Sequence, residues 1–227
     1  MRNWLAALVL CCAANNTLAA QQITPSEQVI SVQTDGSVEL SSSGRAVFKN
    51  LLLPDAKLAE NWLSAHLLQQ RIAVDSSNVD RYARKQIISG QEAEMLRAGV
   101  AMIYASDGEI PANWQAAEAA ARNAKTGIWA SGEVLLAAEN MADHLGEFHL
   151  VEGTVQAIYE SKSATYLNFG KDWHDDFSIT IPAKARRSMK PLLQQIKVGD
   201  RLRVRGGITQ ENGPMIKLLH AENLEKI

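Results

Sequence analysis

Cysteine is almost absent from this sequence. The 227 residues include two cysteines, Cys11 and Cys12, and both lie among the first twenty residues. Without those twenty residues the chain can form no disulfide and has neither a thiolate nucleophile nor a cysteine ligand for a metal. Aromatic residues are also few, at 6% of the chain, which argues against a dense surface for stacking nucleic-acid bases.

Neither sign of charge dominates the chain. Lys and Arg number 23 against 25 Asp and Glu, so the net charge of −2 excludes a chain that is strongly basic throughout. Residues 21–145 carry fifteen acidic and ten basic residues, whereas residues 146–227 carry ten acidic and twelve basic residues. With 46% hydrophobic and 21% charged residues, the composition is that of a folded protein of one or two domains.

The longest apolar run lies at the start of the chain. A basic residue precedes an apolar stretch over residues 4–14, and small residues follow it up to Ala20. This pattern is typical of a secretory signal peptide, so we expect residues 1–20 to be removed and the mature chain to begin near Ala20 or Gln21. Export to a bacterial periplasm or exterior follows. A lipid-modified cysteine is the weaker alternative, because a large residue precedes Cys11. No other segment is apolar enough to span a membrane.

Residues 21–132 alternate between strand-like and helix-like patterns. Alternation on both sides of a turn at residues 34–36 predicts a β-hairpin. Apolar residues at helical spacing predict helices, two of which should end near Gly99 and Gly127. The expected strands cover residues 29–33, 37–40, 46–53, 71–74 and 84–88, and the expected helices cover residues 56–68, 90–98 and 111–125.

Three motifs make residues 28–130 resemble the thermonuclease (staphylococcal nuclease-like) family. Residues 80–84 read DRYAR and are similar to the family's D-x-Y-G-R. Residues 96–104 read LRAGVAMIY and are similar to its V-x-x-G-L-A-x-V-Y. Residues 118–129, from EAAAR to GIW, are similar to its E-x-x-A-R with G-L-W. The resemblance implies a five-stranded OB barrel with helices packed beside it.

The catalytic motif is where the sequence departs from that family. Active members carry R-L-x-G-I-D-x-P-E, whose Arg and Glu work on the scissile phosphodiester and whose Asp helps to hold calcium. The aligned residues here are Val47 for that Arg, Leu52 for that Asp and Asp55 for that Glu. The family's D-G-D-T turn loses one carboxylate and keeps Asp35, and Arg84 keeps the family's second arginine.

These replacements favour a degenerate nuclease site. Phosphodiester hydrolysis needs positive charge on the phosphate oxygens, and calcium needs several oxygen ligands at once. Loss of one such donor typically slows catalysis by about a hundred- to a thousand-fold. The leading interpretation is therefore a secreted thermonuclease-like pseudoenzyme without a cofactor, which binds nucleic acid or serves as a scaffold.

The alternative is an active or weak metal-dependent endonuclease that hydrolyses DNA or RNA. In it, Asp55 and Arg84 would be catalytic, and Asp35 and Asp55 would hold calcium. Each residue also has a structural interpretation. Asp55 could cap a helix that begins at Ala56, Arg84 could pair with Asp80, and Asp35 could simply form the turn.

Residues 146–227 predict a second barrel. Three strands, a helix and two strands follow one another, which is the order of an OB fold. This block resembles the C-terminal domain attached to divergent bacterial thermonuclease-like proteins. The alanine-rich residues 133–145 are expected to form a helical linker. The expected fold class is therefore α+β and rich in β-barrel, with two OB-fold-like barrels and flanking helices.

A surface for single-stranded nucleic acid is the other candidate site. Arg201, Arg203 and Arg205 alternate along one expected strand, so period two places all three on one face. Together with Tyr166 and Trp173 they could contact phosphates and stacked bases. The alternative is that the aromatic residues belong to the core and the arginines form a solvated strand face. The histidines at 66, 144, 149 and 220 show no spacing that suggests a metal site.

Overall fold

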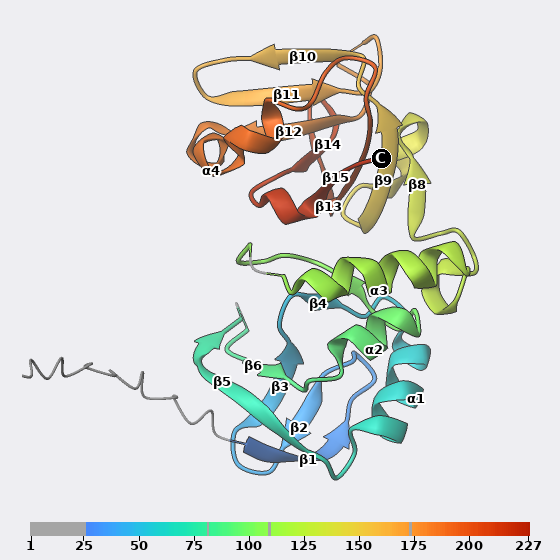
Figure 1. Cartoon of the computed structure of the whole chain (residues 1–227), viewed down its shortest axis with the longest axis vertical. Coiled ribbons are helices and arrows are strands. Elements are labelled where there is room, and N and C mark those ends of the chain that lie inside the picture. The colour runs from blue at the N-terminus through green and yellow to red at the C-terminus, as the bar shows by residue number, and fades with distance from the viewer. Residues whose placement is uncertain (1–25, 81, 109, 173) are drawn as a thin grey trace, which may run out of the picture.

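The computed structural model describes residues 26–80, 82–108, 110–172 and 174–227. The expected signal peptide and Trp173 lie outside the described residues. Two strand-rich units stack along the long axis of the molecule (Figure 1). We call residues 26–132 the first domain and residues 133–227 the second domain. Across the described ranges, no helix combines the length and the apolar character that crossing a membrane requires.

Five strands of the first domain close into a barrel. Their order is β1-β2-β3-β6-β5, in which β3 and β6 are parallel and the other pairs are antiparallel. Inward-pointing residues such as Val29, Val38, Ala46 and Ile87 form its buried core. The strands are β1 (Ser26–Val32), β2 (Val38–Leu40), β3 (Gly44–Phe48), β5 (Arg71–Val79) and β6 (Lys85–Ile88).

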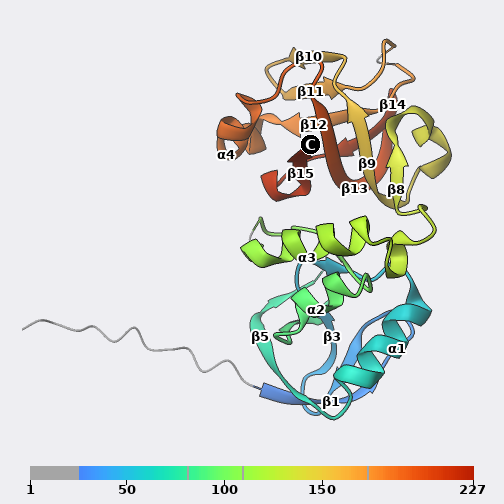
Figure 2. The ribbon, with the colours of Figure 1, turned by 45° about the vertical axis from the view of Figure 1, so that its right-hand side comes forward.

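Three helices and a short strand pair flank this barrel. They are β4 (Leu51–Leu52), α1 (Ala56–His66), α2 (Glu92–Arg97), β7 (Met102–Ile103) and α3 (Ala112–Asn123). Pro111 lies just before α3, where its missing N–H removes no helical hydrogen bond. In both ribbon views α3 lies across the boundary between the two domains (Figure 1, Figure 2).

The chain passes close to itself where α2 and α3 end. Gly99 follows α2 with a φ of +65°, and Gly127 opens the 3₁₀ turn η1 (Gly127–Trp129) with a φ of +60°. Ile128 donates its N–H to the Gly99 carbonyl at 2.8 Å. A Cβ on Gly99 would lie 2.1 Å from the carbonyl oxygen of Thr126, so no larger residue fits. The helices end close to these two glycines, as predicted.

The second domain repeats the strand pairing of the first. Its order is β10-β11-β12-β14-β13-β9-β8, and β12 runs parallel to β14 as β3 does to β6. Residues 155–156 alone separate β9 from β10, so one stretch of chain supplies both of these strands. The elements are β8 (Leu135–Ala137), η2 (Ala138–His144), β9 (Phe148–Thr154), β10 (Ala157–Glu160), β11 (Ala164–Asn168), β12 (Ser178–Pro182), α4 (Ala183–Leu193), β13 (Arg201–Glu211), β14 (Gly213–Lys217), η3 (Ala221–Asn223) and β15 (Leu224–Lys226).

The predicted α+β class is confirmed, with a closed five-stranded barrel in the first domain and a strand-rich sheet in the second. The predicted single helix over residues 133–145 is wrong. Leu135 to Ala137 instead pair in parallel with β9, and a 3₁₀ helix follows. Leu135 and Leu136 pack against the apolar clusters beneath the sheet. These contacts and the ladder of backbone hydrogen bonds outweigh the helix propensity of the alanines.

Apolar side chains from both domains meet beneath α3. Leu150 of β9 is fully buried in one cluster with Met102 and Trp129 of the first domain. Tyr104 and Phe148 pack edge to face across the same boundary, with ring centroids 5.0 Å apart. The two domains therefore share a packed interface as well as a chain connection.

Candidate functional site

Two arginines of the first barrel converge on one carboxylate. Asp35 lies in the turn between β1 and β2, where its Oδ1 accepts hydrogen bonds from the backbone N–H of Ser37 at 3.1 Å and its hydroxyl at 2.6 Å. Arg45 points out of the barrel because its neighbour Ala46 points in, and its Nη2 lies 2.9 Å from Asp35 Oδ1. Arg84 Nη1 lies 3.5 Å from Asp35 Oδ2.

Arg84 is held firmly in this position. Its Nη2 lies 2.6 Å from Asp80 Oδ2, and its backbone N–H donates to Asp80 Oδ1 at 2.9 Å. The guanidinium carbon lies 5.3 Å from the ring centre of Tyr82, whose side chain is 63% exposed. The resulting depression, which we call the arginine pocket, has a volume of about 550 Å³. It is lined by Asp35, Ser43, Arg45, Tyr82, Ala83 and Arg84.

The carboxylates of this cluster are ionised at neutral pH. Burial opposes ionisation of Asp35, but hydrogen bonds from Ser37 and the charge of Arg45 outweigh it and hold the pKa of Asp35 below its usual value. The pKa of Asp80 is likewise lowered, because the bonds from Arg84 outweigh burial. A guanidinium carries five N–H donors, so Arg45 and Arg84 can each bind a further anion besides these carboxylates.

Asp55 does not belong to the arginine pocket. Its Oδ1 accepts a hydrogen bond from the backbone N–H of Leu58 at 2.9 Å, which makes it the N-cap of α1. Leu52 pairs with Met102 in the β4–β7 ladder and places an alkyl side chain where the resemblance puts a calcium ligand. The structure thus brings together Asp35 and Arg84, two of the three predicted residues, and adds Arg45 to them.

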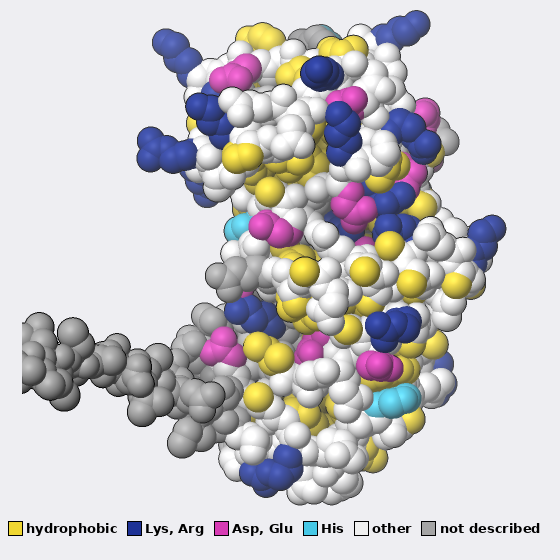
Figure 3. All heavy atoms as spheres, in the orientation of Figure 1, with side chains coloured by type: hydrophobic (Ala, Val, Ile, Leu, Met, Phe, Trp, Pro, Cys, Tyr) yellow, Lys and Arg dark blue, Asp and Glu magenta, His cyan; other side chains and the backbone are white. Residues whose placement is uncertain are grey.

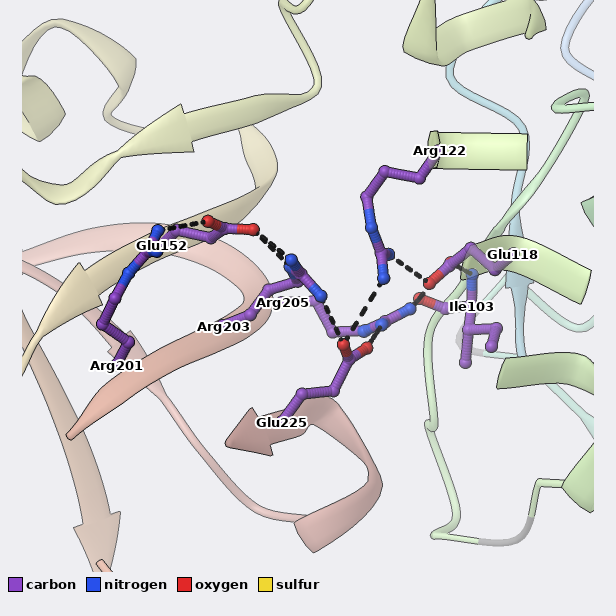
Figure 4. A network of polar contacts seen from close by, with 8 residues as sticks. All are labelled: Ile103, Glu118, Arg122, Glu152, Arg201, Arg203, Arg205 and Glu225. Carbon is purple, nitrogen blue, oxygen red and sulfur yellow. Dashed lines mark hydrogen bonds and ion pairs between the residues drawn. The ribbon is translucent and has the colours of Figure 1, made fainter. Parts of the chain in front are cut away.

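The arginine row of β13 runs from an exposed Arg201 to Arg205, which is buried against the first domain. Leu202 and Val204 point into the core of the second domain, so the predicted alternation is confirmed. The predicted exposure holds for Arg201, whose side chain is 62% exposed, but it is wrong for Arg203 and Arg205, whose side chains are 14% and 1% exposed. Arg205 Nη1 lies 2.8 Å from Glu118 Oε1 of α3 and donates to the Ile103 carbonyl at 3.2 Å (Figure 4). Arg205 has no access to a phosphate in this arrangement.

Glutamates accompany every arginine of this row (Figure 4). Arg203 pairs with Glu152 and lies 2.8 Å from Glu225, and Arg201 lies 3.2 Å from Glu152. Arg205 pairs with Glu225 as well. Burial opposes ionisation of Glu225, but Arg205 and the other guanidinium groups lower its pKa below the usual value. Arg205 therefore links the two domains, whereas Arg201 and Arg203 pair within the second domain. The sequence pattern alone could not distinguish this arrangement from a nucleic-acid surface.

Among the described residues, the visible surface of the second domain also shows no gathering of basic side chains of the kind that a nucleic-acid surface would have (Figure 3). On the face shown in Figure 3, Lys and Arg side chains are spread around the second domain and are not gathered over one element.

A second link between the domains is uncharged: Asn223 accepts a hydrogen bond from the Ala105 N–H at 2.9 Å and donates to the Ala105 carbonyl at 3.0 Å.

Tyr166 lies in a different hollow, together with an aromatic residue that the sequence analysis missed. Tyr159 of β10 lies directly opposite Tyr166 of β11, with the rings stacked 6.2 Å apart. They line a hollow of about 520 Å³, which we call the tyrosine hollow, and its one charged lining residue is Glu211. A tight turn at residues 161–163 would have predicted this pairing. The other lining residues are Asn168, Ser178, Asn212, Gly213 and Met215.

Comparison with known proteins bears on the first domain. Residues 43–131 match the model of the family described as Staphylococcal nuclease homologue. No curated protein matches the chain. Among solved structures, a chain of the S. pombe Stn1–Ten1 complex is 14% identical with a TM-score of 0.29, and the match covers 35% of this chain and 57% of that one. A putative aspartyl-tRNA synthetase from Leishmania major is 10% identical with a TM-score of 0.31, and the match covers 40% of this chain and 20% of that one.

This chain spans less than two thirds of either of those two proteins, and similarity at these TM-scores carries no argument about function. The family match covers the larger part of the first domain, including β3 to β7 and α1 to α3. A closed five-stranded barrel accompanies it. The first domain is therefore a staphylococcal nuclease-like, OB-like domain, and its kind supports a nuclease-like or nucleic-acid-binding function.

Proposed function

We propose that this chain is an exported, non-catalytic nucleic-acid-binding protein built on a degenerate staphylococcal nuclease-like domain. The observation that carries the proposal is the convergence of Arg45 and Arg84 on Asp35 in the arginine pocket. Two guanidinium groups on one side of a small depression can bind a phosphodiester through several N–H donors. The proposed partner is therefore single-stranded nucleic acid, and its proposed binding site is the arginine pocket.

The same pocket lacks what hydrolysis would require. The family is calcium-dependent in general. In this chain Asp35 is engaged by two arginines, and Asp55 caps α1. Leu52 supplies no oxygen where the resemblance places a calcium ligand. Binding of the phosphate remains chemically possible. Asp35, the one carboxylate among the described residues that line the pocket, is engaged by both arginines and is therefore not available to activate a water.

Tyr82 suits a base next to the bound phosphate. Its ring is largely exposed and lies beside the Arg84 guanidinium. A base that stacks on an exposed aromatic ring while its phosphate meets an arginine is the common mode of single-strand binding. The tyrosine hollow of the second domain offers another stacking surface, with Tyr159 and Tyr166 side by side. The proposed interface thus lies mainly on the first domain, since Arg205 is buried between the domains and Arg201 and Arg203 are paired with glutamates.

The test is binding of a fluorescently labelled single-stranded oligonucleotide to the purified chain at low salt, followed by anisotropy. The double variant Arg45→Ala/Arg84→Ala should bind at least about tenfold more weakly, because each removes phosphate contacts. Arg97→Ala is the matched control, since Arg97 is an exposed arginine of the same domain outside the pocket. Equal binding by the double variant and the unmodified chain would refute the proposal.

A further inference from the structure

Two histidines and a glutamate converge where η2 leads into β9. His144 Nδ1 lies 2.8 Å from Glu147 Oε2, and His149 Nε2 lies 2.7 Å from the same oxygen. The two imidazole rings meet at 69° with centroids 4.9 Å apart. One ligand atom from each of the three residues lies within 4.8 Å of the others. This cluster is separate from the arginine pocket and from the tyrosine hollow.

The backbone fixes the position of all three side chains. Gly146 reverses the chain with a φ of +87° and donates its N–H to the Ile208 carbonyl at 2.8 Å. Ile208 in turn donates to the Glu147 carbonyl at 2.9 Å. His149 lies opposite Gly206 in the β9–β13 ladder. The turn that carries the ligands is thus bound to the central strand of the domain, so they are held close together before any ligand arrives.

We propose that His144, Glu147 and His149 form a binding site for a divalent transition metal of the zinc class. Two imidazoles and one carboxylate are a ligand set that zinc accepts, with a water or another group in the fourth position. Ligand atoms about 2.0–2.1 Å from a tetrahedral ion lie about 3.3 Å from one another. The nitrogens lie 2.7 and 2.8 Å from the Glu147 oxygen, so each contact needs to lengthen by only about half an ångström.

Exposure and charge both suit a metal. His149 is mostly buried and anchors the site, whereas Glu147 is exposed and leaves a side open for the ion and its water. The Glu147 carboxylate supplies a negative charge for a divalent cation, and the two imidazoles supply nitrogen ligands. Imidazole ligands favour zinc, copper and nickel over calcium and magnesium, which prefer oxygen. The proposed ion is thus distinct from the calcium of the nuclease family.

The experiment is calorimetric titration of the purified chain with zinc chloride. One zinc ion should bind per chain, and His144→Ala/His149→Ala should weaken binding beyond the about 10- to 100-fold that loss of an outer-shell partner causes. The milder variant Glu147→Gln should weaken it too. His66→Ala is the matched control, because His66 lies on α1 with a Trp62 contact and away from the cluster. Circular dichroism without zinc establishes that each variant is folded.

Thermal unfolding gives a second readout that does not depend on heats of binding. Zinc at about 100 times its dissociation constant should raise the Tm of the unmodified chain and of His66→Ala by about 5 °C, and leave that of the double variant unchanged. The absence of saturable zinc binding, or equal binding by the folded double variant, would overturn the proposal. Both readouts are independent of nucleic acid, so they stand apart from the proposed function.

Discussion

At the scale of single residues, most polar side chains singled out in the sequence have local structural partners. Asp55 caps the helix that begins one residue later, an outcome that its place before Ala56 already suggested. Arg84 pairs with Asp80, which a spacing of four residues allowed. The meeting of Arg45 with Asp35 could not be predicted in the same way, because it depends on the register between β2 and β3.

Asp55 gives a prediction about stability rather than activity. Asp55→Ala should lower the free energy of unfolding by about 1 kcal/mol, because the Leu58 N–H loses its capping acceptor. Asp55→Asn should lower it by much less, since asparagine caps equally well. Urea unfolding measures both. Oligonucleotide affinity should be the same in all three proteins, and a large loss of affinity in Asp55→Asn would place this residue in the binding site.

Asp35 gives a prediction about binding: its replacement should increase the affinity for an oligonucleotide. Asp35→Asn removes the carboxylate that competes with a phosphate for Arg45 and Arg84, so oligonucleotide affinity should rise by a few-fold. Anisotropy at low salt measures this, with Asp107→Asn as the control because Asp107 pairs with Lys49 elsewhere. If Asp35 instead held a metal needed for binding, the substitution would weaken it.

At the scale of elements, the strand and helix patterns predicted the barrel of the first domain and the strand-rich sheet of the second. Alternation identified the strands because each has one face in the core, and glycine identified the ends of α2 and α3. The stretch from residue 133 to 145 failed because its alanines favour a helix locally while Leu135 and Leu136 pair and pack along β9. Tertiary contacts of this kind cannot be predicted from a short segment of sequence alone.

The crossing of Gly99 and Gly127 predicts a steep effect of a single methyl group. Gly99→Ala should lower the free energy of unfolding by more than about 2 kcal/mol. The added methyl group would overlap the Thr126 carbonyl, and the alanine would have to adopt a positive φ. Gly132→Ala is the control, since Gly132 has a φ of +79° and open space around it. It should lose only about 1–2 kcal/mol, from the backbone conformation alone. If thermal or urea unfolding showed equal losses of stability in Gly99→Ala and Gly132→Ala, the proposed overlap with the Thr126 carbonyl would be contradicted.

At the scale of the whole molecule, Arg205 of the arginine row joins the two domains by pairing with Glu118. Period-two spacing correctly placed Arg201, Arg203 and Arg205 on one face, but an isolated strand does not reveal what covers that face. The acidic partners come from three distant segments, Glu118 on α3, Glu152 on β9 and Glu225 on β15. The sequence predicted two domains and could not predict that their charges meet in an interface.

Glu225 makes this interface sensitive to acid. Its pKa is lowered in the folded protein, so its contribution to stability is complete above about pH 4.5, the unfolded value, and is lost as the pH falls through the folded value. Glu225→Gln should therefore be less stable than the unmodified chain at pH 7, and the difference should narrow below about pH 4.5. Urea unfolding at a series of pH values measures it. A difference that does not change with pH would show that the charge of Glu225 contributes nothing.

The most direct test of the account combines binding and cleavage in one experiment. The purified chain is incubated with labelled single-stranded DNA in calcium or in chelator, and the DNA is followed by anisotropy and on a denaturing gel. The account predicts DNA that is bound and intact in both conditions, with binding weakened in Arg45→Ala/Arg84→Ala purified in the same way. Calcium-dependent cleavage that disappears in Arg84→Ala would contradict it and identify an active nuclease.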